Sequence, residues 1–325
     1  MNNKYYSIQA LRGLGAISVV VFHSLSLAPI FNFKAGAAGV DLFFIISGFV
    51  MCMALRPQTN QIDFLARRVI RVTPIYWVAT AITVVYYLLR YPETPPSAEH
   101  IIKSFLFLPP PDGFGKPILY PGWTLNYEMF FYFTLSSFMI FKGRAISITC
   151  CALIVMGTAI SSSKYGNNIY YANPILLEFV AGLLIGRVVK LGYHPSKKTG
   201  ILLLCSSLII FATHNHLKSD GIIAWGIPSA LLVIGALAFE DSSLVKNKIS
   251  QLLGEASYSI YVFHIIVIWA IDWSAPDSRS PILIAVATSA SIVVGIVAHK
   301  TIERPMLKSM QGLLSIRKAP LDTAP

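Results

Sequence analysis

Residues 13–33 read GLGAISVVVFHSLSLAPIFNF, a run of 21 positions without Asp, Glu, Lys or Arg. A helix needs about 20 mostly apolar residues to cross the hydrocarbon core of a bilayer, so this run is long enough to span a membrane. Its apolar residues follow one another instead of alternating with polar ones, which argues against a strand of a membrane barrel. The stretch therefore predicts a helical membrane protein.

Similar runs occur along the whole chain, and turn-forming residues such as Tyr91-Pro92 separate several of them. They cover residues 11–31, 37–55, 73–91, 119–141, 145–163, 171–189, 200–216, 222–239, 256–272 and 281–300. Only 13% of the residues are charged, against roughly 25% in soluble domains. So few charges exclude a cytosolic two-domain enzyme, a disordered chain and a disulfide-rich secreted module. We expect an all-α integral membrane protein with about ten transmembrane helices.

The basic residues are distributed unequally between the two sides of these spans. With the N-terminus placed inside, 19 of the 26 Lys and Arg residues fall on the inner side and 7 on the outer side. Because cytoplasmic loops collect Lys and Arg, both termini are expected in the cytoplasm. This asymmetry explains much of the net charge of +11 without a nucleic-acid partner. The four cysteines form no CxxC pair, so neither a metal site nor a disulfide framework is expected.

Arg12 and His23 lie on the first predicted span, where ionisable side chains are costly and often functional. Their spacing of eleven residues is about three helical turns, which puts both on one face roughly 16 Å apart along the axis. Arg12 then lies at the cytoplasmic edge and His23 near the middle of the membrane. An interfacial anchor for Arg12 and a structural interhelical hydrogen bond for His23 are equally compatible with the spacing alone.

A second basic group, Arg67-Arg68-Val69-Ile70-Arg71, ends the loop before the third span. Arg68 and Arg71 are three residues apart, so they share a face if this segment is helical. The planar guanidinium matches phosphate well, because its donors form a fixed fork. The general tendency of Lys and Arg to gather on the cytoplasmic side would also account for this charge.

Two carboxylates, Asp41 and Glu128, fall within predicted spans near the outer side. The position of Asp41 also fits a carboxylate at the positive end of a helix dipole. Glu128 would lie about 12 Å below the start of its span, level with His23. A carboxylate beside an imidazole fixes its tautomer and raises its basicity. Glu178 and His264 are weaker candidates, since each also fits a structural polar link between helices.

Several short motifs occur in order along these spans. They are IQALRG (8–13) followed by VFH (21–23), GVDLFFIISGF (39–49), RVIR (68–71), WTLNYE (123–128), YSIYVFH (258–264) and ERP (303–305). Each alone is a weak signal, but together they make the sequence resemble the membrane-bound acyltransferase family 3 over roughly residues 5–305. The WTLNYE form is most similar to the exopolysaccharide acetyltransferase branch of that family.

The resemblance implies an O-acetyltransferase of the bacterial cytoplasmic (inner) membrane. Such an enzyme moves acetyl groups from acetyl-CoA to a hydroxyl of an envelope or extracellular polysaccharide, or of its lipid-linked precursor. Arg12, Arg68 and Arg71 are then expected to bind the phosphates of coenzyme A. His23 would act as general base or as transient acyl carrier, oriented by Glu128 or Asp41. Acetyl-CoA is a co-substrate, so no permanently bound cofactor is expected.

We expect an acyltransferase transmembrane domain over residues 1–305 and a basic cytoplasmic tail over residues 306–325. The expected partners are acetyl-CoA, the sugar acceptor and the lipid bilayer, with homo-oligomers or polysaccharide-assembly proteins as further candidates. Two other classes stay open. A glycolipid or sugar transporter or flippase would use the intramembrane charges for coupling, although no internal repeat is detectable. A structural membrane protein would leave the gathering of arginines at one edge unexplained.

Overall fold

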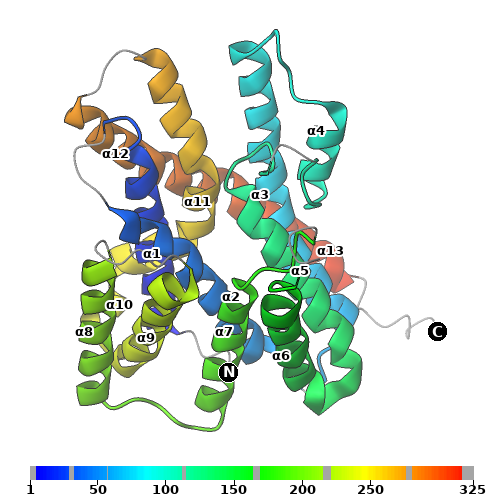
Figure 1. Ribbon diagram of the computed structural model, residues 1–325, viewed down its shortest axis with the longest axis vertical. Helices are drawn as coiled ribbons and strands as arrows, with labels where there is room; N and C mark the ends of the chain where they lie inside the picture. The colour runs from blue at the N-terminus through cyan, green and yellow to red at the C-terminus, as the bar shows by residue number, and fades with distance from the viewer. Residues whose placement is uncertain are drawn as a thin grey trace, which may run out of the picture.

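The computed structural model describes residues 5–28, 33–56, 58–111, 115–163, 169–214, 221–275 and 280–316, and in these ranges every regular element is helical (Figure 1). The main helices are α1 (Tyr6–Ser24), α2 (Gly39–Ala54), α3 (Gln61–Arg90), α4 (Ala98–Phe105), α5 (Gly122–Phe138), α6 (Ala145–Val155), α7 (Leu176–Lys190), α8 (Lys197–His214), α9 (Ile227–Ala236), α10 (Ser243–Lys246), α11 (Lys248–Ser274), α12 (Pro281–Ala298) and α13 (Arg304–Ile316). Short helical turns join several of them: η1 (Lys34–Ala38), η2 (Met139–Arg144), η3 (Met156–Ile160), η5 (Ile222–Gly226), η6 (Leu237–Phe239) and η7 (His299–Glu303). The predicted all-α class is confirmed.

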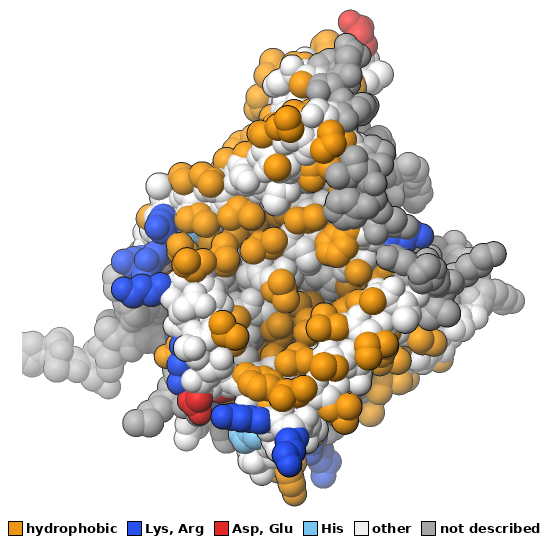
Figure 2. Space-filling view, turned by 90° about the vertical axis from the view of Figure 1, so that its left-hand side faces the viewer, with side chains coloured by type: hydrophobic (Ala, Val, Ile, Leu, Met, Phe, Trp, Pro, Cys, Tyr) orange, Lys and Arg blue, Asp and Glu red, His pale blue; other side chains and the backbone are white. Residues whose placement is uncertain are grey.

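A membrane-spanning character is supported by the length and the surface of these helices. Among the described residues, six segments are long and apolar enough to cross a membrane: Lys34–Ala54, Gln61–Arg90, Gly122–Ile160, Ile222–Phe239, Lys248–Ser274 and Pro281–Met310. Large apolar side chains such as Leu88, Ile209 and Val293 are exposed on the outside of the bundle. Figure 2 shows one face on which hydrophobic side chains cover much of the visible surface. Lipid is the solvent that such a surface requires.

The ten predicted runs each contain a helix, although several boundaries differ from the prediction. The segment Gly122–Ile160 is broken at Lys142, whose φ of 47° lies in the left-handed region, so α5 and α6 are separate helices packed side by side. Beyond the last run, α13 continues across the predicted boundary after residue 305. Residues 306–316 of the predicted tail are therefore helical, and residues 317–325 lie outside the described ranges.

α3 begins at Gln61, twelve residues before the predicted third span, so the basic group is helical rather than part of a loop. Asn60 explains the early start. Its side-chain oxygen accepts hydrogen bonds from two backbone N–H groups of the first turn, at 2.9 and 3.2 Å. Such an N-cap satisfies donors that a helix end would otherwise leave unpaired. Arg68 and Arg71 consequently share one face of α3, one turn apart.

α1 ends at Ser24, seven residues before the predicted end of the first span, so His23 lies in its last turn. His23 is thus near the end of its helix, and its expected position near the middle of the membrane stays a prediction. The hydroxyl of Ser26 donates to the carbonyl oxygen of His23 at 2.7 Å. This bond satisfies a carbonyl that the end of the helix leaves without its usual partner. Part of the predicted extension, residues 29–32, lies outside the described ranges.

α1 packs along α11, and two glycines set how these helices meet. A Cβ atom on Gly254 would overlap the carbonyl oxygen of Gln9, and one on Gly13 would lie 3.0 Å from the backbone nitrogen of Gly254. Small residues of this kind let two membrane helices approach closely. His23 and His264 each follow their own glycine by ten residues, about 15 Å along the axis. The glycine contact therefore brings the two imidazoles to one level on parallel helices.

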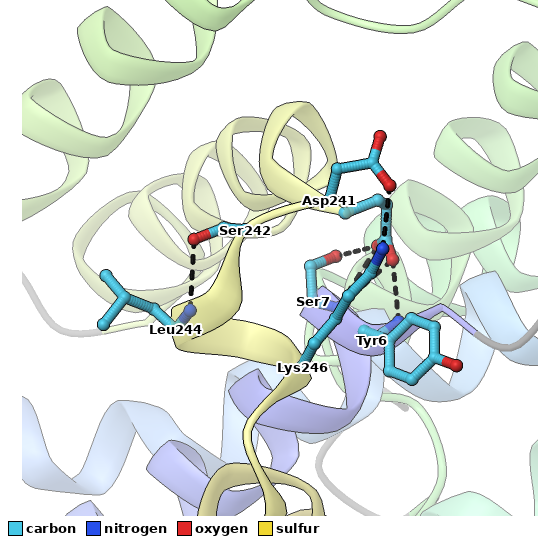
Figure 3. A network of polar contacts seen from close by, with 7 residues as sticks. Tyr6, Ser7, Asp241, Ser242, Leu244 and Lys246 are labelled. Atoms are coloured by element: carbon cyan, nitrogen blue, oxygen red, sulfur yellow. Dashed lines mark hydrogen bonds and ion pairs between the residues drawn. The ribbon is translucent and has the colours of Figure 1, made fainter.

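The N-terminus of α1 is held by a carboxylate from a distant part of the chain. Glu240, directly after η6, accepts hydrogen bonds from the backbone nitrogens of Tyr6 at 2.7 Å and Ser7 at 3.2 Å, and from the Ser7 hydroxyl. Figure 3 shows this network, with Tyr6 and Ser7 beside the segment that carries Asp241 and Lys246. A negative charge at this end of a helix also meets the positive end of its dipole.

We expect Glu240→Ala to destabilise the protein, because α1 loses its cap. The loss of a helix cap costs about 0.5–2 kcal/mol, so the Tm in detergent should fall by roughly 1–8 °C. Asp241→Ala is the matched control, since Asp241 contacts Lys246 only at the surface. An unchanged Tm for the Glu240 variant, or an equal fall for the control, would contradict the capping role. Thermal unfolding followed by size-exclusion chromatography measures both.

Candidate active site

A cavity of about 100 Å³, here called the central cavity, lies between α1, α2, α3, α5 and α11. Its polar lining comes from residues far apart in the sequence: Arg12, Ser47, Arg68, Arg71, Thr124, Glu128, Tyr132, Tyr258 and Tyr261. Apolar side chains such as Phe43, Phe44 and Met51 form the rest of its wall. Polar groups that converge beside an apolar wall are typical of a small-molecule site.

The three arginines expected to act together do meet in this cavity. Arg12 comes from α1, and Arg68 and Arg71 come from the shared face of α3. Within the described ranges, the Nε atom of Arg68 is buried without a hydrogen-bond partner. An unpaired buried donor on a charged group is costly, so the structure leaves a place here for an anionic or polar acceptor.

The same three arginines also line a second cavity, here called the outer cavity. Its wall is completed by the N-terminal part of α1, the C-terminal end of α2 and the end of α7, including Tyr5, Phe49, Arg56 and Lys190. The arginines therefore stand at the junction of the two cavities.

Glu128 belongs to the arginine site rather than to the histidine. Its carboxylate accepts hydrogen bonds from Ser47 at 3.1 Å and from Tyr132. The carboxylate lines the central cavity together with the arginines. The expected pairing of Glu128 with His23 is not found, because α5 packs on α3 and α2 while His23 faces α11.

Asp41 is also separate from His23. It lies in the first turn of α2, is 9% exposed, and its carboxyl hydrogen-bonds to that of Glu178 on α7. Contact between two carboxyl groups requires one of them to carry the proton. The close packing of α2 on α7 explains this pairing, since it turns Asp41 away from α1. The expectation that Asp41 could orient His23 was therefore wrong.

The partner of His23 is His264, whose importance sequence reasoning underrated. His264 is fully buried, and its Nε2 atom lies 3.1 Å from Nδ1 of His23. The Nδ1 atom of His264 lies 2.5 Å from the carbonyl oxygen of Tyr261, so this nitrogen must carry a proton. In the neutral ring Nε2 of His264 is then an acceptor, and Nδ1 of His23 is the donor that it receives.

Nδ1 of His23 also faces the carbonyl oxygen of Val19 at 3.1 Å, and this second acceptor fixes the same tautomer. The hydrogen-bond network consequently leaves Nε2 of His23 as its unprotonated nitrogen. The ring of Tyr120 lies 5.8 Å from that of His23. An unprotonated ring nitrogen in a partly exposed imidazole is suited to removing a proton from a hydroxyl.

Tyr261 connects the histidine pair to the central cavity. Its ring lies 5.7 Å from that of His264 and also lines the cavity. Its hydroxyl and that of Thr124 are 2.9 Å apart, which fixes the position of the ring. Tyr261 thus lies against His264 and also lines the cavity that the arginines line.

Glu303 is a further buried group near the arginines that the sequence indicated only through the ERP motif. It is 2% exposed and accepts hydrogen bonds from the Ser259 hydroxyl at 2.7 Å and from the His299 ring at 2.8 Å. Such a fully bonded carboxylate is well placed to hold η7 against α11. We infer no chemical step for it.

A family model described as an acyltransferase domain matches residues 5–300. The chain is 36% identical to the exopolysaccharide production protein ExoZ of Rhizobium meliloti, over 85% of this chain and 91% of that protein. It is 24% identical to the acyltransferase MdmB of Streptomyces mycarofaciens, over 98% and 94% of the two chains. It is 23% identical to the peptidoglycan O-acetyltransferase OatA of Listeria monocytogenes, over 93% of this chain and 56% of that protein. No solved structure matches the chain.

Proposed function

The chain belongs to the acyltransferase domain family, and we propose that it is a membrane O-acetyltransferase acting on an envelope or extracellular polysaccharide or its lipid-linked precursor. The acceptor class rests on the relatives, since ExoZ is an exopolysaccharide production protein and OatA a peptidoglycan O-acetyltransferase. The donor is acetyl-CoA. The observation that carries the proposal is that three arginines line one cavity together with Tyr261, whose ring lies against that of His264, the partner of His23.

The arginines bind the phosphates of the donor from the cytoplasmic side. A guanidinium forms charge-assisted bonds to phosphate in pairs, and three of them converge on one place from two helices. The pantetheine arm then extends through the central cavity toward Tyr261, along the length of α1. Arg12 and His23 are roughly 16 Å apart along that helix, which an extended arm has to cover.

His23 acts as the general base at the end of this path. Its Nε2 takes the proton of the acceptor hydroxyl while the hydroxyl oxygen attacks the thioester carbonyl. The new C–O bond forms, the C–S bond breaks, and the thiolate of coenzyme A leaves and receives a proton from the imidazolium. His264 keeps Nδ1 of His23 protonated throughout, so the nitrogen that faces the substrate stays the basic one.

We place the chain in the bacterial cytoplasmic membrane with ten crossings and both termini in the cytoplasm. The excess of Lys and Arg on the side of the N-terminus supports this orientation. It puts the outer cavity at the cytoplasmic face, where acetyl-CoA is made, and the end of α1 that carries His23 toward the opposite face.

Base-labile acetate on purified surface polysaccharide tests the proposal. Cells carrying the native chain, an empty vector and His23→Ala are compared at matched membrane levels of the protein. Acetate that depends on the native chain is the expected result. Equal acetate in all three, together with no release of coenzyme A from acetyl-CoA by native membranes, would contradict it and favour a transport function.

We expect His264→Leu to slow transfer by about 3- to 10-fold, because one hydrogen bond that holds the tautomer of His23 is lost. His264→Gln offers an amide oxygen as acceptor in the same place and should recover part of the rate. Initial rates at saturating donor measure the effect, with the KM for acetyl-CoA unchanged in both variants. A rate equal to the native one in the Leu variant would remove His264 from the positioning role.

A further inference from the structure

Two basic residues of the outer cavity have no part in the phosphate binding that we assign to the three arginines. Arg56 and Lys190 line only this cavity, whereas Arg12, Arg68 and Arg71 line both. Five basic side chains therefore line the outer cavity, and none of the described residues that line it is Asp or Glu. A cluster of positive charges along one hollow favours an anionic ligand.

The two groups of cations occupy different places along the path. The arginines line both cavities, while Arg56, two residues past the C-terminus of α2, and Lys190 line the outer cavity alone. Lys190 comes from the last turn of α7, and its Nζ donates to the carbonyl oxygen of Leu55 at 2.6 Å. This bond holds the ammonium at the residue that precedes Arg56.

A cation at the end of a helix often serves only to cap its carbonyl groups. That reading accounts for the bond from Lys190 to Leu55. It does not account for Arg56 on the same cavity wall, or for the continuity of this wall with Arg12, Arg68 and Arg71. The rings of Tyr5 and Phe49 meet edge to face, 5.2 Å apart, on the wall of the same cavity. They add an aromatic surface suited to a planar nucleobase.

Coenzyme A carries its negative charge in two separate places. A diphosphate joins the pantetheine arm to the ribose, and a phosphomonoester stands on the 3′-oxygen of that ribose. With the arm in the central cavity, the diphosphate falls at the junction and the 3′-phosphate falls farther out. We propose that Arg56 and Lys190 form a second anion subsite that binds the 3′-phosphate of the donor, an inference that rests on the proposed function.

Binding of coenzyme A and of dephospho-coenzyme A, which lacks only the 3′-phosphate, to purified protein in detergent tests the subsite. The native protein should bind coenzyme A at least about 10-fold more tightly, because bonds to a charged group are lost with the phosphate. In the double variant Arg56→Gln/Lys190→Gln the preference should fall to near unity, while dephospho-coenzyme A binds as it does to the native protein. Glutamine at 190 keeps a donor for Leu55 and so preserves the cap.

Arg67→Gln/Arg187→Gln is the matched control. Arg67 is exposed on α3, and Arg187 is exposed on α7, where it donates to Ser147. This variant should keep the native preference. The single variants Arg56→Gln and Lys190→Gln should each lose part of it.

Three results would overturn the proposed subsite without contradicting acetyl-CoA as the donor. They are equal binding of both ligands by the native protein, a preference that survives in the double variant, and a double variant that weakens both ligands equally. Failure of the native protein to bind either ligand would instead overturn the proposed function and the subsite with it. The two failures are therefore distinguishable in one experiment.

Discussion

His23→Gln is expected to lower acetyl transfer by about 10²- to 10⁴-fold, the contribution typical of a general base. Binding of coenzyme A should stay at the native level, because His23 lies apart from the arginines that line both cavities. Glutamine retains a hydrogen-bond donor for Val19, so the end of α1 keeps its local contacts. Transfer of radiolabelled acetyl to isolated polysaccharide and equilibrium binding of coenzyme A measure the two effects separately.

His194→Gln is the control for this substitution, since His194 is exposed in the loop after α7. It should transfer acetyl at the native rate. Full activity of the His23 variant would remove the residue from the mechanism. Mass spectrometry of the native protein after incubation with donor alone distinguishes the two possible roles, because a general base gains no acetyl group and an acyl carrier does.

Arg68→Gln is expected to weaken the binding of acetyl-CoA by about 10- to 100-fold, since bonds to charged groups are worth about 1.5–3 kcal/mol each. Among the described residues the buried Nε of Arg68 has no hydrogen-bond partner, and in the proposed function a phosphate of the donor is its acceptor. The maximal rate at saturating donor should change far less than the KM, because Arg68 contacts the donor away from the thioester. Initial rates over a range of acetyl-CoA concentrations separate the two.

Arg67→Gln removes the same charge one residue earlier, on the exposed side of α3, and should leave both constants unchanged. A rise in KM of equal size in both variants would mean that the general positive charge of this face attracts the donor. A fall in maximal rate without a change in KM for Arg68→Gln would place Arg68 at the reacting centre instead.

Spacing within one helix could be read from the sequence, and contacts between helices could not. The intervals from Arg12 to His23 and from Arg68 to Arg71 depend only on helical geometry, so the shared faces were predictable. From the sequence, Arg12 and the two arginines of α3 were expected only to lie at the same cytoplasmic edge. The structure shows that all three line one cavity. The N-cap that makes the α3 pair helical could have been read from Asn60, which is of a residue type preferred at the start of a helix.

The partner of His23 was beyond such reasoning, because it depends on which helix packs against α1. Glu128 matched His23 in estimated depth, yet depth says nothing of direction around the bundle axis. The decisive signal was a matched interval: Gly13 and Gly254 each precede a histidine by ten residues. Two equal intervals on different helices predict a paired contact only once those helices are known to be parallel neighbours, which no single sequence states.

The glycine contact between α1 and α11 has a consequence for what the donor must look like. Because Gly13 and Gly254 are in close contact, α1 cannot slide along α11, so His23 stays level with His264. The height of His23 above Arg12 is set by α1 itself, which carries both residues. In the proposed reaction, α1 therefore sets the distance between the arginine that binds phosphate at one end and the general base at the other. A donor with an arm shorter than pantetheine would bind through its phosphates, but its thioester would not reach His23. The length of one rigid helix, rather than contacts with the acyl group, would therefore make the enzyme selective for coenzyme A as the carrier.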